Sequence, residues 1–223
     1  MEEDINHSTA KATKLPTFRK GKKVGIYGGS FNPIHRGHIA LARQMLRKAH
    51  LDEVWFLVSP LNPFKQASTD LLDDQTRLQL TRQALADEPR LVASDYEFHL
   101  PRPSYSWDTL QALSRDYPEH DFVLVIGADN WARFPQWYES EEILRHHRLI
   151  ILPRPGYTLE GLPEGVSVAR TPLLNISSTE IRAAIARGGY HGKGLPRAVW
   201  HEIRRKGLYT KEQYDNDQSG NGI

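Results

Sequence analysis

The strongest constraint on the fold is a regular alternation of strand-like and helix-like segments. Residues 23–27 and 54–58 are short β-prone apolar runs, and residues 38–49 between them carry apolar side chains at helical spacing. These segments predict one strand–helix–strand unit. The alternation continues, with helices predicted at 74–86 (Asp74 as N-cap), 106–116, 140–146 (capped by Ser140), 177–186 and 196–206, and strands at 122–126, 149–152 and 166–169.

This alternation has a defined architectural consequence. Parallel strands joined by helices form a sheet covered on both faces, with right-handed crossovers. We therefore predict a doubly wound α/β fold with a parallel sheet, in a single domain. Ligands of such folds bind at the carboxyl ends of the strands. Attention falls on the segments after Tyr27, Val58, Ile126 and Leu152.

The loop after the first predicted strand is the most informative segment. It reads Gly28-Gly29-Ser30-Phe31-Asn32-Pro33-Ile34-His35-Arg36-Gly37-His38. The two glycines allow the backbone to come close to a ligand, with N–H groups free to meet phosphate oxygens. His35 and His38 lie three residues apart on one face at the start of the next helix, where the helix dipole favours an anion.

Other interpretations of this loop are weaker. Neither G-x-x-x-x-G-K-[ST] nor G-x-G-x-x-G occurs here, and the Gly-Lys-Lys at 21–23 precedes the strand. A zinc site would need a third ligand, and none is nearby in sequence. The structural alternative is that the two histidines only cap the helix. The length of the whole block at residues 28–38 makes this alternative less favoured.

The block resembles the G-G-[ST]-F-[DN]-P-x-H-x-G-H signature of bacterial nicotinate mononucleotide adenylyltransferases, in the H-x-G-H nucleotidyltransferase superfamily. The resemblance runs from about Lys23 to Tyr209 and implies a Rossmann-like nucleotidyltransferase fold. Residues 176–182, I-S-S-T-E-I-R, resemble the second family signature, I-S-[SA]-T-x-I-R. Asn32 stands where the family often has Asp, a change from which we expect little effect.

Four further segments carry the resemblance. Residues 103–110 match P-S-Y-[ST]-x-x-T-L, residues 126–138 match I-G-x-D followed by P-x-W-[YH], and residues 154–156 match R-P-G. In the loop at 62–65 the family's P-[PH]-H-K reads Asn-Pro-Phe-Lys, so Lys65 is kept but Phe64 replaces His.

The resemblance implies that the 5′-phosphate of nicotinate mononucleotide attacks the α-phosphorus of ATP, giving deamido-NAD and pyrophosphate in NAD biosynthesis. The implied catalytic residues are His35, His38, Lys65 and Arg182. The implied ATP-binding residues are Gly28, Gly29, Ser30, Phe31, His35, His38, Gly127, Asp129, Ile176, Ser177, Ser178 and Arg182. The implied mononucleotide-binding residues are Asn32, Ser106, Thr109, Trp137, Tyr138 and Arg154. Mg²⁺ is expected to arrive with ATP, because no protein cage of carboxylates is visible.

Three other functions stay open. A sister transferase, such as phosphopantetheine adenylyltransferase, shares the first loop but should lack the P-x-W-[YH] and R-P-G segments. A nucleotide-binding regulator would keep the pocket without chemistry, and the presence of both histidines and Arg182 argues against it. A nucleic-acid-binding module would need a clustered basic face, which the net charge of +2 does not favour.

The composition bounds the rest. There is no cysteine, which excludes disulfides and thiolate metal sites. No segment approaches the roughly 20 apolar residues of a membrane span, and residues 1–23 lack the apolar core of a signal peptide. We expect a cytoplasmic enzyme with a disordered extension at 1–20, a nucleotidyltransferase domain at 21–214 and a flexible tail at 215–223. Its oligomeric state is left open.

Overall fold

The structure, a computed structural model, describes residues 21–60, 71–169 and 176–211. Its strands are β1 (Lys23–Gly29), β2 (Glu53–Val58), β3 (Leu91–Ser94), β4 (Asp121–Gly127), β5 (Arg148–Leu152) and β6 (Val166–Val168). Its α-helices are α1 (Arg36–Lys48), α2 (Asp74–Ala84), α3 (Ser106–Asp116), α4 (Ala128–Trp131), α5 (Ser140–His146), α6 (Ser178–Ala186) and α7 (Arg197–Lys206), with short 3-10 helices η2 (Tyr96–His99) and η3 (Phe134–Gln136).

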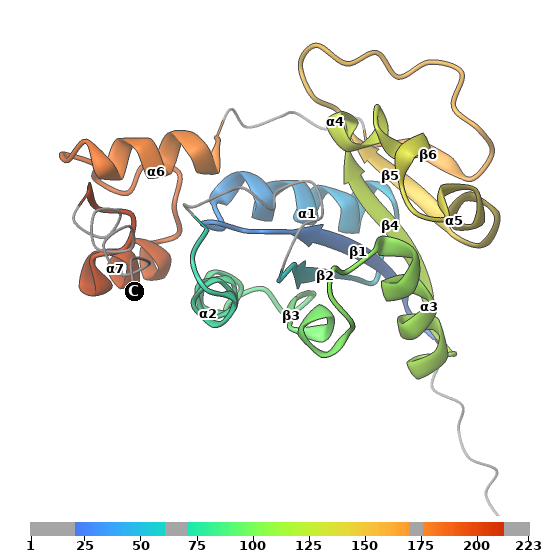
Figure 1. Cartoon of the computed structure of the whole chain (residues 1–223), viewed down its shortest axis with the longest axis horizontal. Helices are drawn as coiled ribbons and strands as arrows, with labels where there is room; N and C mark the ends of the chain where they lie inside the picture. Colours follow the sequence, from blue (N-terminus) through green and yellow to red (C-terminus); the bar gives the residue numbers. More distant parts are fainter. Residues whose placement is uncertain (1–20, 61–70, 170–175, 212–223) are drawn as a thin grey trace, which may run out of the picture.

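The strands form one six-stranded sheet in the order β3-β2-β1-β4-β5-β6, and every neighbouring pair is parallel (Figure 1). The chain builds the sheet outward from β1 in one direction and then outward from β4 in the other. The predicted doubly wound α/β fold is therefore confirmed. The order reverses between β1 and β4, which is where such sheets place a ligand crevice.

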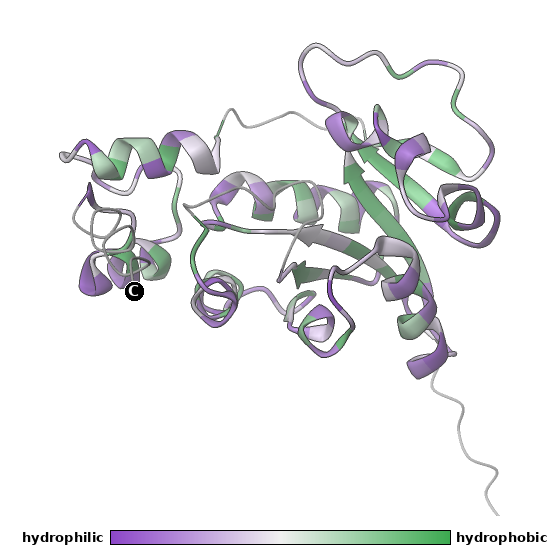
Figure 2. Ribbon diagram, viewed as in Figure 1, coloured by the Kyte–Doolittle hydropathy of each residue, from purple (hydrophilic) through white to green (hydrophobic). Residues whose placement is uncertain are grey.

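A separate hydrophobic core covers each face of the sheet. Because side chains alternate along a strand, β4 sends Val123 and Val125 to one face and Leu124 and Ile126 to the other. The first core also holds residues of α1, α2, α6 and α7, and the second holds residues of α3 and α5. Figure 2 shows the hydrophobic residues concentrated on the strands and hydrophilic residues on the outer helices.

Several boundaries differ from the sequence predictions. β1 continues through Gly28 and Gly29, because both pair with β2, whereas the glycines were expected to end the strand at Tyr27. α1 begins at Arg36 rather than at residue 38, with His35 as its N-cap. The carboxylate that caps α2 is that of Asp73, which accepts from the N–H of Thr76 at 2.8 Å.

Two other helix starts are also corrected. Ser140 does not cap α5; the N-cap is Glu139, in a left-handed conformation with φ of 52°. Pro196 is the N-cap of α7 rather than its first helical residue. Gly207, with φ of 63°, follows Lys206 and ends that helix at its predicted last residue. β3, η2, α4 and η3 were not predicted.

Within the described ranges, no helix combines the length and apolar character needed to cross a membrane. The terminal segments predicted at 1–20 and 215–223 lie outside the described residues, so the proposed boundaries stay predictions.

Candidate active site

A cavity of about 590 Å³ opens at the carboxyl ends of the central strands, within the usual range for small-molecule sites. Its walls come from the ends of β1, β2, β4 and β5 and from the first turns of α3 and α6. The predicted site residues that line it are Gly28, Gly29, Ser30, Phe31, Asn32, His38, Ser106, Gly127, Asp129, Trp137, Tyr138, Arg154, Ser178 and Arg182. Segments more than 150 residues apart thus meet in one place.

The other predicted residues lie behind the walls or beyond the described chain. His35 and Thr109 are buried. Ile176 packs against the first core, and Ser177 caps α6 by accepting from the N–H of Glu180 at 3.5 Å. Lys65 falls outside the described residues, so its role stays a prediction.

The two histidines cap α1 reciprocally. Nδ1 of His35 accepts from the backbone N–H of His38 at 3.4 Å, and Nδ1 of His38 accepts from the N–H of His35 at 3.2 Å. Their rings stack with centroids 3.6 Å apart. Capping and substrate binding are therefore compatible, because His38 fulfils the first role while lining the cavity.

His35 is held in its neutral form. Burial, followed by the positive charge of Arg154, lowers the pKa of His35 from 6.5 to about 4. Because Nδ1 accepts a hydrogen bond, the proton of the neutral ring lies on Nε2. His35 therefore offers an uncharged N–H donor at neutral pH.

Asn32 ties the loop after β1 to the C-terminal helices. Its Oδ1 accepts from the hydroxyl of Tyr209 at 2.7 Å and from the N–H of Leu72 at 3.3 Å. Its carbonyl accepts from Nη1 of Arg182 at 2.8 Å, and Ser178 Oγ donates to the carbonyl of Pro33 at 3.0 Å. The Asn32 side chain thus has a clear structural task, while its predicted contact with the mononucleotide stays a prediction.

The end of the cavity at α3 and η3 offers donors and aromatic rings. Tyr105, the N-cap of α3, makes no side-chain cap bond within the described residues, so the first-turn N–H groups around Ser106 can meet an anion. Trp137 packs on Phe134, and its indole N–H is buried without a partner among the described residues. Tyr105 and Tyr138 are exposed, with ring centroids 5.2 Å apart.

A loose ion pair follows β4 and β5. Asp129 Oδ1 lies 3.8 Å from Nε of Arg154, and this oxygen is buried without a hydrogen-bond partner in the described chain. A Cβ on Gly127 would lie only 2.3 Å from the same oxygen. The glycine therefore makes room for the carboxylate of Asp129.

Two residues at this site were missed by sequence reasoning. Glu97 lines the cavity and is buried, with Oε1 accepting from Thr109 Oγ1 at 3.1 Å. Burial raises the pKa of Glu97. Arg77 lies fully buried behind the ends of β1 and β2. Neither residue belongs to a motif, and only their long-range contacts reveal them.

The described residues include no group of three or more His, Cys, Asp or Glu side chains placed to hold a metal ion. A Mg²⁺ ion at this site would take most of its oxygen ligands from phosphates and water.

Comparison with known proteins identifies the family. A sequence model described as cytidylyltransferase-like matches residues 26–184. A protein named probable nicotinate-nucleotide adenylyltransferase from Bacteroides thetaiotaomicron is 51% identical over 184 residues, covering 82% of this chain and 91% of that protein. One of the same name from Flavobacterium johnsoniae is 41% identical over 194 residues, covering 85% and 100%.

Solved structures share the fold. The nicotinic acid mononucleotide adenylyltransferase of Plasmodium falciparum, complexed with NaAD, superposes with a TM-score of 0.71 at 20% identity, covering 84% of this chain and 97% of that one. The resemblance stated from the sequence motifs is confirmed, and the chain belongs to the nicotinate-nucleotide adenylyltransferases of the cytidylyltransferase-like family.

Proposed function

We propose that the protein joins the adenylyl group of ATP to nicotinate mononucleotide, forming deamido-NAD and pyrophosphate in NAD biosynthesis. The observation that carries this proposal is a cavity that brings together His38 of the capping histidine pair, the start of α3 and Trp137. Relatives up to 51% identical carry the name of this activity. The phosphopantetheine alternative loses its support, because the segments that it should lack are present and line this cavity.

The reaction needs positioning more than a protein nucleophile. An oxygen of the mononucleotide phosphate attacks the α-phosphorus of ATP, and the bond to the oxygen that bridges to the β-phosphorus breaks. Pyrophosphate leaves with that electron pair. The attacking phosphate is already anionic, so catalysis consists of alignment and stabilisation of the negative charge that spreads in the transition state.

The residues for that task lie around the β1 loop. His38 and Arg182 line the cavity and can donate to the triphosphate, and Lys65 is proposed to join them. Neutral His35 would add an N–H donor next to His38. Mg²⁺ bound to ATP would neutralise further phosphate charge.

The acceptor end suits an acid. The carboxylate of the nicotinate ring would accept from the N–H groups that begin α3, and Trp137 would stack on the ring. A nicotinamide amide would present its own N–H donors to the same groups. Badly paired groups cost roughly 1–3 kcal/mol each, enough for tenfold or greater preference for the acid.

We further propose that the enzyme works in the cytoplasm, with these two nucleotides as its partners and without nucleic acid. The net charge of +2 supports a protein that does not depend on polyanions.

The decisive experiment incubates the purified protein with ATP, Mg²⁺ and either mononucleotide, and identifies the products by chromatography and mass spectrometry. We expect deamido-NAD and stoichiometric pyrophosphate, with kcat/KM at least about tenfold higher for the acid than for the amide. Binding of both nucleotides without pyrophosphate release would favour a regulator instead. Equal kcat/KM values would refute the acid preference.

A further inference from the structure

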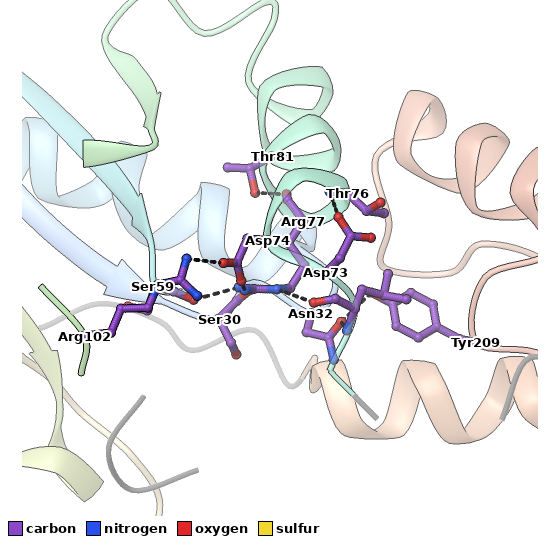
Figure 3. A network of polar contacts seen from close by, with 11 residues as sticks. Ser30, Asn32, Ser59, Asp73, Asp74, Thr76, Arg77, Thr81, Arg102 and Tyr209 are labelled. Carbon is purple, nitrogen blue, oxygen red and sulfur yellow. Dashed lines mark hydrogen bonds and ion pairs between the residues drawn. The ribbon is translucent and has the colours of Figure 1, made fainter. Parts of the chain in front are cut away.

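Arg77 of α2 is a fully buried charged residue that the proposed reaction does not use directly. Its side chain is 0% exposed and contacts Ser30 and Ser59, which follow β1 and β2 (Figure 3). Buried guanidinium groups are costly unless every donor is engaged. Its partners therefore indicate what the residue does.

Those partners are mainly backbone carbonyls at the strand ends. Nη1 donates to the carbonyls of Ser30 at 2.8 Å and Ser59 at 2.9 Å, and Nε donates to that of Leu72 at 2.8 Å. Ser30 and Ser59 both line the cavity. One rigid fork thus fixes the segments that follow β1 and β2 relative to the start of α2.

The positive charge of Arg77 is balanced by the carboxylate of Asp74. Nη2 of Arg77 pairs with Asp74 Oδ1 at 2.5 Å, and Arg102 pairs with the other oxygen of Asp74 at 2.9 Å. Figure 3 shows Asp74 between the two arginines. The inner and outer ion pairs share one carboxylate, but only Arg77 reaches the carbonyls.

The Ser30 contact sets the direction of the next N–H. In a trans peptide the C=O and the following N–H point in opposite directions. Because the Ser30 carbonyl points to Arg77, the N–H of Phe31 points away from Arg77, and both Ser30 and Phe31 line the cavity.

Phe31 needs this support because it is strained. Its φ of 44° lies in the left-handed region, which a bulky residue adopts only when its surroundings enforce it. Arg77 holds the carbonyl before Phe31, and Arg182 holds the carbonyl of Asn32 after it. The ring is fixed against Tyr27 and Phe56, with centroids 5.6 and 5.3 Å away.

We propose that Arg77 is a positioning residue for adenylyl transfer, which holds the loop after β1 so that the N–H of Phe31 faces the phosphates of ATP. This inference rests on the proposed function. It differs from a general stabilising role because the expected effect is on the phosphates of ATP at this loop, whereas the nicotinate ring is proposed to bind at α3.

The mutational test compares Arg77→Lys and Arg77→Met with Arg102→Met. Lysine keeps the positive charge beside Asp74. Its single ammonium group cannot donate to the three carbonyls that the planar guanidinium of Arg77 reaches. The control removes the outer partner of Asp74 and leaves every Arg77 bond in place. All four proteins, including wild type, are assayed for kcat, for KM of each substrate and for melting temperature.

We expect kcat/KM for ATP to fall by about tenfold or more in Arg77→Lys and further in Arg77→Met, as for lost preorganised donors. KM for nicotinate mononucleotide should stay within about twofold, and Arg102→Met should stay within about twofold of wild type in every constant. Unchanged kcat/KM for ATP in a folded Arg77→Lys protein overturns the proposal. An equal loss toward both substrates overturns it too.

A measurement on the wild-type protein does not depend on the variants folding. With ¹⁵N-phenylalanine labelling, the amide signal of Phe31, one of seven phenylalanines, should shift on addition of the α,β-methylene analogue of ATP with Mg²⁺. It should not shift with nicotinate mononucleotide alone. No shift with the ATP analogue overturns the inference, whereas absence of dinucleotide product from wild type overturns the proposed function itself.

Discussion

The buried, neutral state of His35 has a direct consequence for stability at acid pH. The unfolded chain protonates this imidazole near pH 6.5, whereas the folded protein does so near pH 4. Between these values the unfolded state binds more protons, so His35 lowers the free energy of unfolding as the pH falls. At about 1.4 kcal/mol per pKa unit, the whole effect is about 3 kcal/mol, and about 2 kcal/mol of it is lost between about pH 7.5 and about pH 5.

The perturbation that isolates this effect is His35→Asn. Asparagine is a good N-cap that can still accept from the N–H of His38, but it does not titrate. Urea unfolding followed by circular dichroism gives the free energy of unfolding of both proteins across the pH range. As the pH falls from about 7.5 to about 5, the free energy of unfolding of the variant should rise relative to that of wild type by about 2 kcal/mol.

A control and a refuting result complete the test. His201→Asn removes an exposed histidine from α7 and is the control for the loss of any one imidazole from the chain. If the His35→Asn and wild-type curves run parallel across the range, His35 is not held neutral by its surroundings. His35 then also does not provide an uncharged N–H donor beside His38.

Four further changes have defined outcomes. His38→Ala should lower kcat by about two to three orders of magnitude, the range for one preorganised donor, and near-wild-type turnover of the folded variant would contradict its assignment. Trp137→Ala should raise KM for both mononucleotides by roughly tenfold through lost stacking without reversing their order, as steady-state kinetics can check. Burial raises the pKa of Glu97, so its contribution to the free energy of unfolding is complete below pH 4.5 and is lost as the pH rises through the folded pKa. Glu97→Gln should therefore stabilise the protein increasingly above pH 4.5. Equal gains in the free energy of unfolding at all pH values would disprove this. Tyr209→Phe leaves Asn32 Oδ1 without its hydroxyl donor and should cost about 1–3 kcal/mol in chemical unfolding.

The sequence predicted the fold well where apolar patterns were long. The helix at 106–116 matches α3 at both ends, and five of the six strands were anticipated. β3 was missed because only Leu91 of its four residues is buried, so the segment has too little apolar pattern to recognise. The extension of β1 through Gly28 and Gly29 depends on pairing with β2, which no local propensity reveals.

The site likewise contains residues that the sequence could predict and residues that it could not. Motif residues such as His38 and Trp137 were predicted because their neighbours in sequence carry the pattern, and both line the cavity. Arg77 contacts Ser30 across 47 positions, and the importance of Glu97 depends on its contact with Thr109. Contacts of this kind arise only when distant segments pack, so composition and spacing could not indicate them.

The bond between Tyr209 and Asn32 joins segments that are synthesised far apart in time. The loop after β1 is made early in synthesis, yet the hydroxyl that satisfies its buried amide oxygen comes from a residue translated 177 positions later. A nascent chain can pair all six strands before α7 emerges, and still present an unfinished nucleotide loop. Chains that stop between α6 and Tyr209 should therefore bind ATP weakly, because the loop after β1 lacks the hydroxyl that Asn32 Oδ1 accepts from.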